Sequence, residues 1–295
     1  MLPYTVRHIT HYRYSDPVEI SQSALWLTPR NTPHQRVLRA AIDVQPRPAV
    51  LSTRIDYFGN AVTLIHVQER HEQVVVLATS DIELTPPTYP DAAATPPWET
   101  VRDAIGGDKA YALPAGIDAL QHRFDSRFVR TGPALLDYAA ASFTPDRPVL
   151  DALVDLTRRI HREFRYDPAS TTVATPIEQV FADRAGVCQD FAHLQIAMLR
   201  SLGLAARYVS GYLFNQPPPG REKLVGADAS HAWVSLFVPG LGWIDADPTN
   251  NTLPREHHLT VAWGRDYADV TPMRGVILGG GAHDVSVAVD VSRAA

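Results

Sequence analysis

The chain has 295 residues, of which 45% are hydrophobic and 20% are charged, and its formal net charge at pH 7 is -5. This balance is typical of a folded globular protein and excludes an intrinsically disordered chain. The arginines form no basic stripe, so a nucleic-acid partner is not expected. No apolar run reaches the ~18 residues of a membrane span, and the N-terminus does not resemble a signal peptide. We therefore expect a cytoplasmic protein with no membrane partner.

Residues 1–85 are predicted to form an antiparallel β-sandwich domain. The segment 4–14 alternates apolar and polar residues, and further alternating or β-branched runs follow at 40–44, 61–67 and 74–82. Residues 86–148 are predicted to be a linker with a helical segment. They begin within the sequence TPPTYPDAAATPP, whose prolines block both a helix and a central strand.

Residues 149–265 are predicted to form a core of helices packed on an antiparallel sheet. Helical spacing of apolar residues predicts a helix over 149–164. A second helix over 188–202 is apolar on nearly every side, which places it at the centre of a domain. Strand-like runs follow at 206–214, 232–238 and 243–247. The expected fold class is α+β, and residues 266–295 are expected to be a C-terminal tail with a strand.

Cys188 is the only cysteine, which excludes an internal disulfide and leaves either plain packing or chemical reactivity. It opens the predicted buried helix, where unpaired backbone N–H groups favour a thiolate and could stabilise an oxyanion. His231 and Asp247 lie on two strands of a predicted hairpin. With a three-residue loop they are diagonal neighbours on one face, whereas a two-residue loop puts Asp247 on the other face. The first register predicts a nucleophile, a base and an orienting acid.

Other polar residues have simpler interpretations. Asp190 and His193 share the buried helix, and we expect both to satisfy backbone groups. Tyr208 and Trp233 are expected to be packing residues on core strands. The histidine pairs 8/11 and 257/258 have no carboxylate or cysteine cluster at ligand spacing, so no metal site is predicted. No cofactor is expected either.

Four ordered blocks resemble the transglutaminase-like superfamily: GVCQDFA at 186–192, ARYVSGY at 206–212, HAWV at 231–234 and GWIDADPTN at 242–250. The segments DYFGN at 56–60 and GRDYADV at 264–270 resemble the N-terminal domain and tail of its bacterial members. The resemblance implies a papain-like fold with Cys188 as nucleophile, His231 as base and Asp247 as the residue that orients the histidine. Gly186 and Gln189 replace a glutamine and a tryptophan of the animal enzymes, so calcium-dependent crosslinking is not carried over.

The expected function is thiol-dependent acyl transfer on an amide bond of a peptide or protein, through a thioester, with water as the acceptor in a peptidase or amidase. One alternative is an amine acceptor, as in a transglutaminase or amide ligase. Another is a catalytically silent protein-binding module, and a zinc-dependent hydrolase ranks last. The sequence leaves open the acyl donor, the oligomeric state, the role of residues 90–145, and whether the loop 215–228 gates the site or only connects strands.

Overall fold

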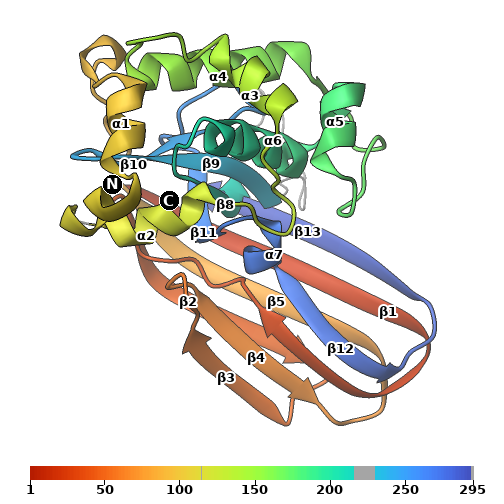
Figure 1. The fold of residues 1–295 in the computed structure, drawn as a ribbon. Helices are drawn as coiled ribbons and strands as arrows, with labels where there is room; N and C mark the ends of the chain where they lie inside the picture. The colour runs from red at the N-terminus through yellow and green to blue at the C-terminus, as the bar shows by residue number, and fades with distance from the viewer. Residues whose placement is uncertain (114, 216–229, 294–295) are drawn as a thin grey trace, which may run out of the picture.

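The computed structural model describes residues 1–113, 115–215 and 230–293. Two parts pack against each other: a large antiparallel sheet built from both ends of the chain, and a helical part with a four-stranded sheet of its own (Figure 1). The predicted α+β class is confirmed. Residues 216–229, which make up most of the predicted proline-rich loop, lie outside the described residues.

The large sheet has seven strands in the order β2-β5-β1-β4-β3, with β12 and β13 also paired to β1. Its edges and centre follow the alternation of the sequence: in β1, Tyr4, Val6 and His8 are buried while Arg7 is exposed. The bounds are β1 (Leu2–Leu25), β2 (Gln35–Gln45), β3 (Val50–Ile55), β4 (Ala61–Val67), β5 (His71–Leu84), β12 (Met273–Gly279) and β13 (His283–Arg293).

Strand β1 belongs to both halves of this sheet. Its first half pairs with β5 and β13, and its second half pairs with β4 and β12. Buried side chains of the two halves face one another, because Leu25 and Ile65 of the second half pack in one cluster with Val74 and Val76 of the first. The layers of the predicted sandwich are therefore halves of one sheet that folds over through β1.

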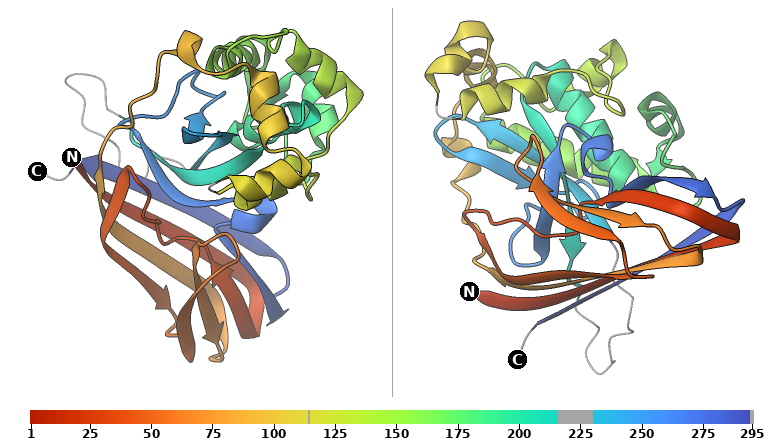
Figure 2. Two further views of the ribbon diagram at one scale, coloured as in Figure 1. Left: turned by 60° about the vertical axis from the view of Figure 1, so that its left-hand side comes forward. Right: turned by 90° about the horizontal axis from the view of Figure 1, so that it is seen from below.

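The C-terminal tail departs from the sequence expectation. Residues 266–295 contain a short helix, α7 (Tyr267–Val270), and two strands instead of one. Both strands pair with β1, so the two ends of the chain lie close together (Figure 2). Nearly all side chains of β12 and most of those of β13 are exposed, and an exposed strand has little hydrophobic alternation to reveal it.

The helical part is built around α6 (Cys188–Ser201), whose residues from Asp190 to Arg200 are all buried. The four-stranded sheet, in the order β10-β9-β8-β11, lies between α6 and the large sheet (Figures 1 and 2). The predicted helices and the hairpin are confirmed. The bounds are α1 (Trp98–Ala104), α2 (Gly116–Leu120), α3 (Pro133–Ala140), α4 (Val149–Glu163), α5 (Ile177–Asp183), β6 (Arg165–Tyr166), β7 (Ala185–Gly186), β8 (Ala206–Leu213), β9 (Ser230–Val238), β10 (Gly242–Ala246) and β11 (His258–Gly264).

A buried arginine ties the end of α6 to three other segments. The guanidinium of Arg200 donates to the carbonyl oxygens of Ala206, Phe124 and Arg265 at 2.6–3.1 Å, and to Ser126 Oγ at 3.1 Å. Each of these oxygens would otherwise have no donor from this side chain in the interior, and a buried acceptor left without a donor is costly. Arg200 thus holds the helix that carries Cys188 in place.

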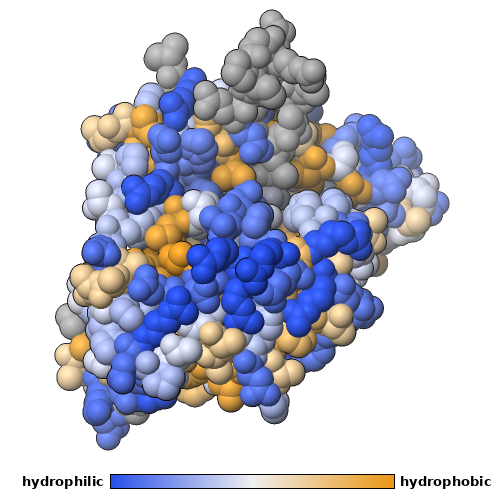
Figure 3. Space-filling model, turned by 90° about the horizontal axis from the view of Figure 1, so that it is seen from above, coloured by the Kyte–Doolittle hydropathy of each residue, from blue (hydrophilic) through white to orange (hydrophobic). Residues whose placement is uncertain are grey.

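The surface that is described offers little for a large apolar interface on the face seen from above. Figure 3 shows this face to be mostly hydrophilic, with apolar residues in small, separate groups. A broad apolar patch is the usual mark of a permanent interface. Among the described helices, none is long and apolar enough to cross a membrane.

Candidate active site

Cys188 is the first residue of α6, and its side chain is half-buried. The turn into the helix is held by Asp190, whose Oδ2 accepts from the Val187 N–H at 2.9 Å and from Thr171 Oγ1 at 2.6 Å. A Cβ on Gly186 would lie 2.9 Å from this carboxylate oxygen, so the cap leaves no room for a side chain there. The expectation that Asp190 satisfies a backbone group is confirmed.

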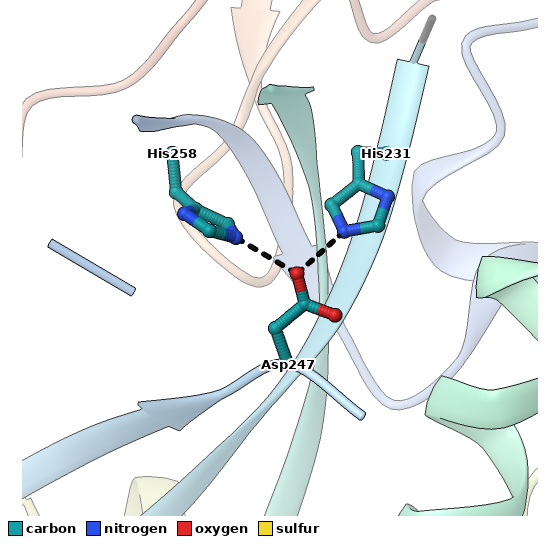
Figure 4. A group of neighbouring side chains, drawn as sticks. All are labelled: His231, Asp247 and His258. Atoms are coloured by element: carbon teal, nitrogen blue, oxygen red, sulfur yellow. Dashed lines mark hydrogen bonds and ion pairs between the residues drawn. The ribbon is translucent and has the colours of Figure 1, made fainter. Parts of the chain in front are cut away.

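The hairpin of β9 and β10 brings His231 and Asp247 together. Val238 pairs with Gly242, which leaves a loop of three residues and gives the register on which the sequence argument depended. Asp247 follows the last residue of β10, and its Oδ2 accepts a hydrogen bond from His231 Nε2 at 2.8 Å (Figure 4). The imidazole and the carboxylate thus meet as predicted.

The carboxylate of Asp247 is completely buried and fully used as an acceptor. Its Oδ1 accepts from the backbone N–H groups of Thr249 at 2.9 Å and Asn250 at 3.1 Å. Its Oδ2 accepts from Asn250 Nδ2 at 2.7 Å and from a second histidine, His258, at 2.9 Å. Burial alone would raise the pKa of Asp247, but the hydrogen bonds and charges of the two histidines hold it well below its usual range. Asp247 is therefore an ionised, immobile partner for His231.

Comparison with known proteins gives the family. Residues 4–83 match the bacterial transglutaminase-like N-terminal region, and residues 137–248 match the transglutaminase-like superfamily. The uncharacterised protein Rv2569c of Mycobacterium tuberculosis is 42% identical over 296 residues, covering 98% of this chain and 92% of that protein. The chain belongs to the transglutaminase-like superfamily.

Two further members of this superfamily bear on the fold and the chemistry. A crystal structure described as that of a candidate cysteine protease from Cytophaga hutchinsonii has a TM-score of 0.75 at 21% identity, covering 99% of this chain and 90% of the other, which shows a shared fold. A protein-glutamine gamma-glutamyltransferase of Pseudomonas aeruginosa is 30% identical over 126 residues, covering 36% of this chain and 19% of that protein.

The charge state of His231 follows from its two neighbours. Burial alone would lower its pKa, but hydrogen bonds to Asp247 and Cys188, and the charges of both, raise the pKa of His231 to about 10. Because Nε2 is bonded to Asp247, Nδ1 is the ring nitrogen left for the thiol. The stability that this proton contributes is complete below pH 6.5 and is lost as the pH rises through about 10. An imidazolium beside Cys188 favours the thiolate.

His258 is the residue of this cluster that sequence reasoning missed. The sequence interpretation, that no carboxylate lies near the 257/258 pair, is wrong for His258, whose Nε2 lies 2.9 Å from Asp247 Oδ2. Strand β11 brings it there from across a loop, so no spacing rule could have found it. The ligand atoms of His231, Asp247 and His258 lie within 4.8 Å of one another, a spacing that a metal ion could use. The two N–H···O hydrogen bonds to one oxygen account for the cluster without an ion.

The remaining sequence candidates are structural. His193 Nε2 accepts from the Tyr267 N–H at 3.1 Å, and burial lowers the pKa of His193 to about 4, so it is a neutral backbone acceptor as expected. Trp233 is completely buried, and its Nε1 donates to Asp245 Oδ2 at 3.1 Å. Tyr208 is buried against His193 at 5.0 Å between ring centroids. None of these three is needed for the thiol chemistry.

Proposed function

We propose that the protein is a transglutaminase-like thiol hydrolase that cleaves an amide bond of a peptide or protein substrate through Cys188, His231 and Asp247. The observation that carries this proposal is the hydrogen bond from His231 Nε2 to the buried Asp247 carboxylate, 2.8 Å long, which directs the other ring nitrogen to the thiol. A nucleophile, a base and an orienting acid in this order are what acyl transfer requires.

The reaction starts from a thiolate–imidazolium pair. The Cys188 thiolate attacks the amide carbonyl carbon, and the backbone N–H at the start of α6 stabilises the oxyanion. The C–N bond then breaks as His231 gives its proton to the leaving amine, and a thioester remains on Cys188. Neutral His231 next takes a proton from water, which attacks the thioester. Release of the carboxylic acid regenerates the thiolate and the imidazolium, while Asp247 keeps the imidazole in one tautomer throughout.

The acceptor in the second half of the cycle decides the class of enzyme. Water gives a peptidase or amidase, and a primary amine gives a transglutaminase from the same thioester. The name of the Pseudomonas relative supports the amine alternative, although that protein matches only 36% of this chain. A silent binding module has no use for a buried carboxylate that holds His231, so we rank it below both enzymes.

Incubation with a complex peptide mixture and excess cadaverine separates these classes by mass spectrometry. We expect new peptide termini or deamidated side chains to outnumber cadaverine adducts, and all products to vanish in Cys188→Ala and after iodoacetamide, but not with a chelator. Adducts in excess of hydrolysis products would replace the hydrolase by a transglutaminase. Products that survive in Cys188→Ala, or that a chelator abolishes, would contradict the thiol mechanism itself.

A further inference from the structure

A second arginine in the interior, Arg207 on β8, has no acceptor for its charge. Its side chain is buried, and within the described part of the chain its guanidinium forms no hydrogen bond or ion pair, with Nε fully enclosed. It lies instead between two indole rings, 4.0 Å from the centroid of Trp243 and 3.6 Å from that of Trp263. A buried charge without a counter-charge is expensive, and two aromatic faces offset only part of this cost.

The contrast with the other arginines shows that this fold does satisfy guanidinium groups. Arg200 makes hydrogen bonds to four oxygen atoms. Arg30, which stacks on Trp263 at 3.2 Å, also donates to Asn60 Oδ1 at 2.5 Å and to the Phe58 carbonyl at 3.1 Å. Two guanidiniums this near one centroid must lie on opposite faces of the ring. Arg207 is therefore stacked like Arg30 but lacks the oxygen acceptors that Arg30 has.

Arg207 faces a cavity of about 430 Å³ between the large sheet and the four-stranded sheet. This volume is within the range of small-molecule sites, roughly 300–1,000 Å³. The large sheet and the loop that follows it contribute Leu84 and Pro87, and the four-stranded sheet contributes Val209 and the two tryptophans beside Arg207. The walls are thus largely apolar and aromatic around one unpaired cation.

We propose that this cavity binds a small molecule with a carboxylate group and an apolar body, and that the carboxylate pairs with the Arg207 guanidinium. The guanidinium fork matches the two oxygens of a carboxylate. Asp118 and Asp245 also line the cavity, and their charges disfavour a doubly charged anion such as phosphate. The indole and proline surfaces suit a flat or aliphatic body.

The site is separate from the thiol but adjoins its support. His258 lines the cavity and donates to Asp247, so a bound molecule lies one side chain away from the orienting carboxylate. The binding proposal does not depend on the thiol chemistry, because it rests on Arg207 and the cavity alone. It assigns a ligand class to a part of the molecule that the catalytic cycle leaves without a role.

Isothermal titration of the full chain with phenylacetate, phenylacetamide and inorganic phosphate tests this proposal. The acid and the amide share size and shape and differ in charge. We expect phenylacetate to bind saturably and at least about tenfold more tightly than phenylacetamide, because a charge-assisted pair replaces a neutral contact. Phosphate is expected not to compete. Equal binding of acid and amide, no binding of phenylacetate, or displacement of phenylacetate by phosphate would each overturn the proposal.

Two methionine substitutions locate the binding. Arg207→Met should weaken phenylacetate binding by about tenfold or more and leave phenylacetamide unaffected. Arg30→Met is the matched control, since Arg30 stacks on the same indole without lining the cavity, and it should bind phenylacetate like the wild type. Wild-type affinity in Arg207→Met would refute the site. If either variant does not fold, the comparison of acid with amide on the wild type still decides.

Discussion

Replacement of Asp247 by asparagine is expected to lower kcat/KM for amide hydrolysis by about 1,000- to 10,000-fold while the protein stays folded. An amide that donates to His231 Nε2 places the ring proton on Nδ1, so that neutral His231 can no longer accept a proton from water or the thiol. The amide oxygen still accepts from the Thr249 and Asn250 N–H groups, which keeps the loop after β10 in place. The measurement is steady-state hydrolysis of a substrate identified in the peptide screen.

Asp155→Asn is the control for this loss. Asp155 also accepts from cationic side chains, Arg147 and Arg158, but it lies on α4 away from the thiol. We expect its activity to stay within about twofold of the wild type, as for most surface ion pairs. Near wild-type activity in Asp247→Asn, with unchanged circular dichroism, would show that Asp247 does not orient His231.

Replacement of Arg200 by methionine is expected to lower the free energy of unfolding by about 3–5 kcal/mol. The substitution keeps the apolar volume but removes every donor to the Ala206, Phe124 and Arg265 carbonyls and to Ser126 Oγ. Those oxygens then remain buried without this partner, and an unsatisfied buried acceptor costs about 1–3 kcal/mol. Urea denaturation followed by circular dichroism measures the change.

Arg207→Met is the matched comparison, because the residue type, the substitution and the burial are the same. This guanidinium has no oxygen acceptor among the described residues, so its removal orphans nothing and eliminates a buried charge. We expect a loss below about 1.5 kcal/mol, mainly from the two cation–π contacts. Equal losses in the two variants would contradict the assignment of Arg200 as a hydrogen-bonded tie and Arg207 as an unpaired charge.

Local periodicity predicted the parts of the fold on which the thiol site depends. The helix that opens at Cys188 follows from an apolar run that ends at Gly203, whose φ of 81° needs a glycine. The position of Asp247 relative to His231 follows from the three-residue hairpin loop, since a strand period of two decides which face each side chain takes. These features depend on neighbours in the sequence and are therefore legible there.

The features that were missed depend on contacts between distant segments. His258 meets Asp247 only because β11 pairs with β8 at the edge of the sheet. Strands β12 and β13 are mostly exposed and join the N-terminal sheet more than 250 positions away from their partners in β1. The unpaired charge of Arg207 becomes visible only when the tryptophans of β10 and the end of β11 enclose it. No spacing rule within one segment reports such contacts.

The rate of Cys188 alkylation by iodoacetamide as a function of pH tests the central claim most directly, and intact mass identifies the product because the chain has one thiol. Since His231 keeps its proton up to a pKa of about 10, we expect a high rate constant that stays nearly flat from neutral pH toward that value. His231→Gln should lower the rate at pH 7 and restore a rise with pH. A wild-type rate that follows an ordinary free thiol, with a midpoint near about 8.5, and that does not change in His231→Gln would contradict a thiolate–imidazolium pair.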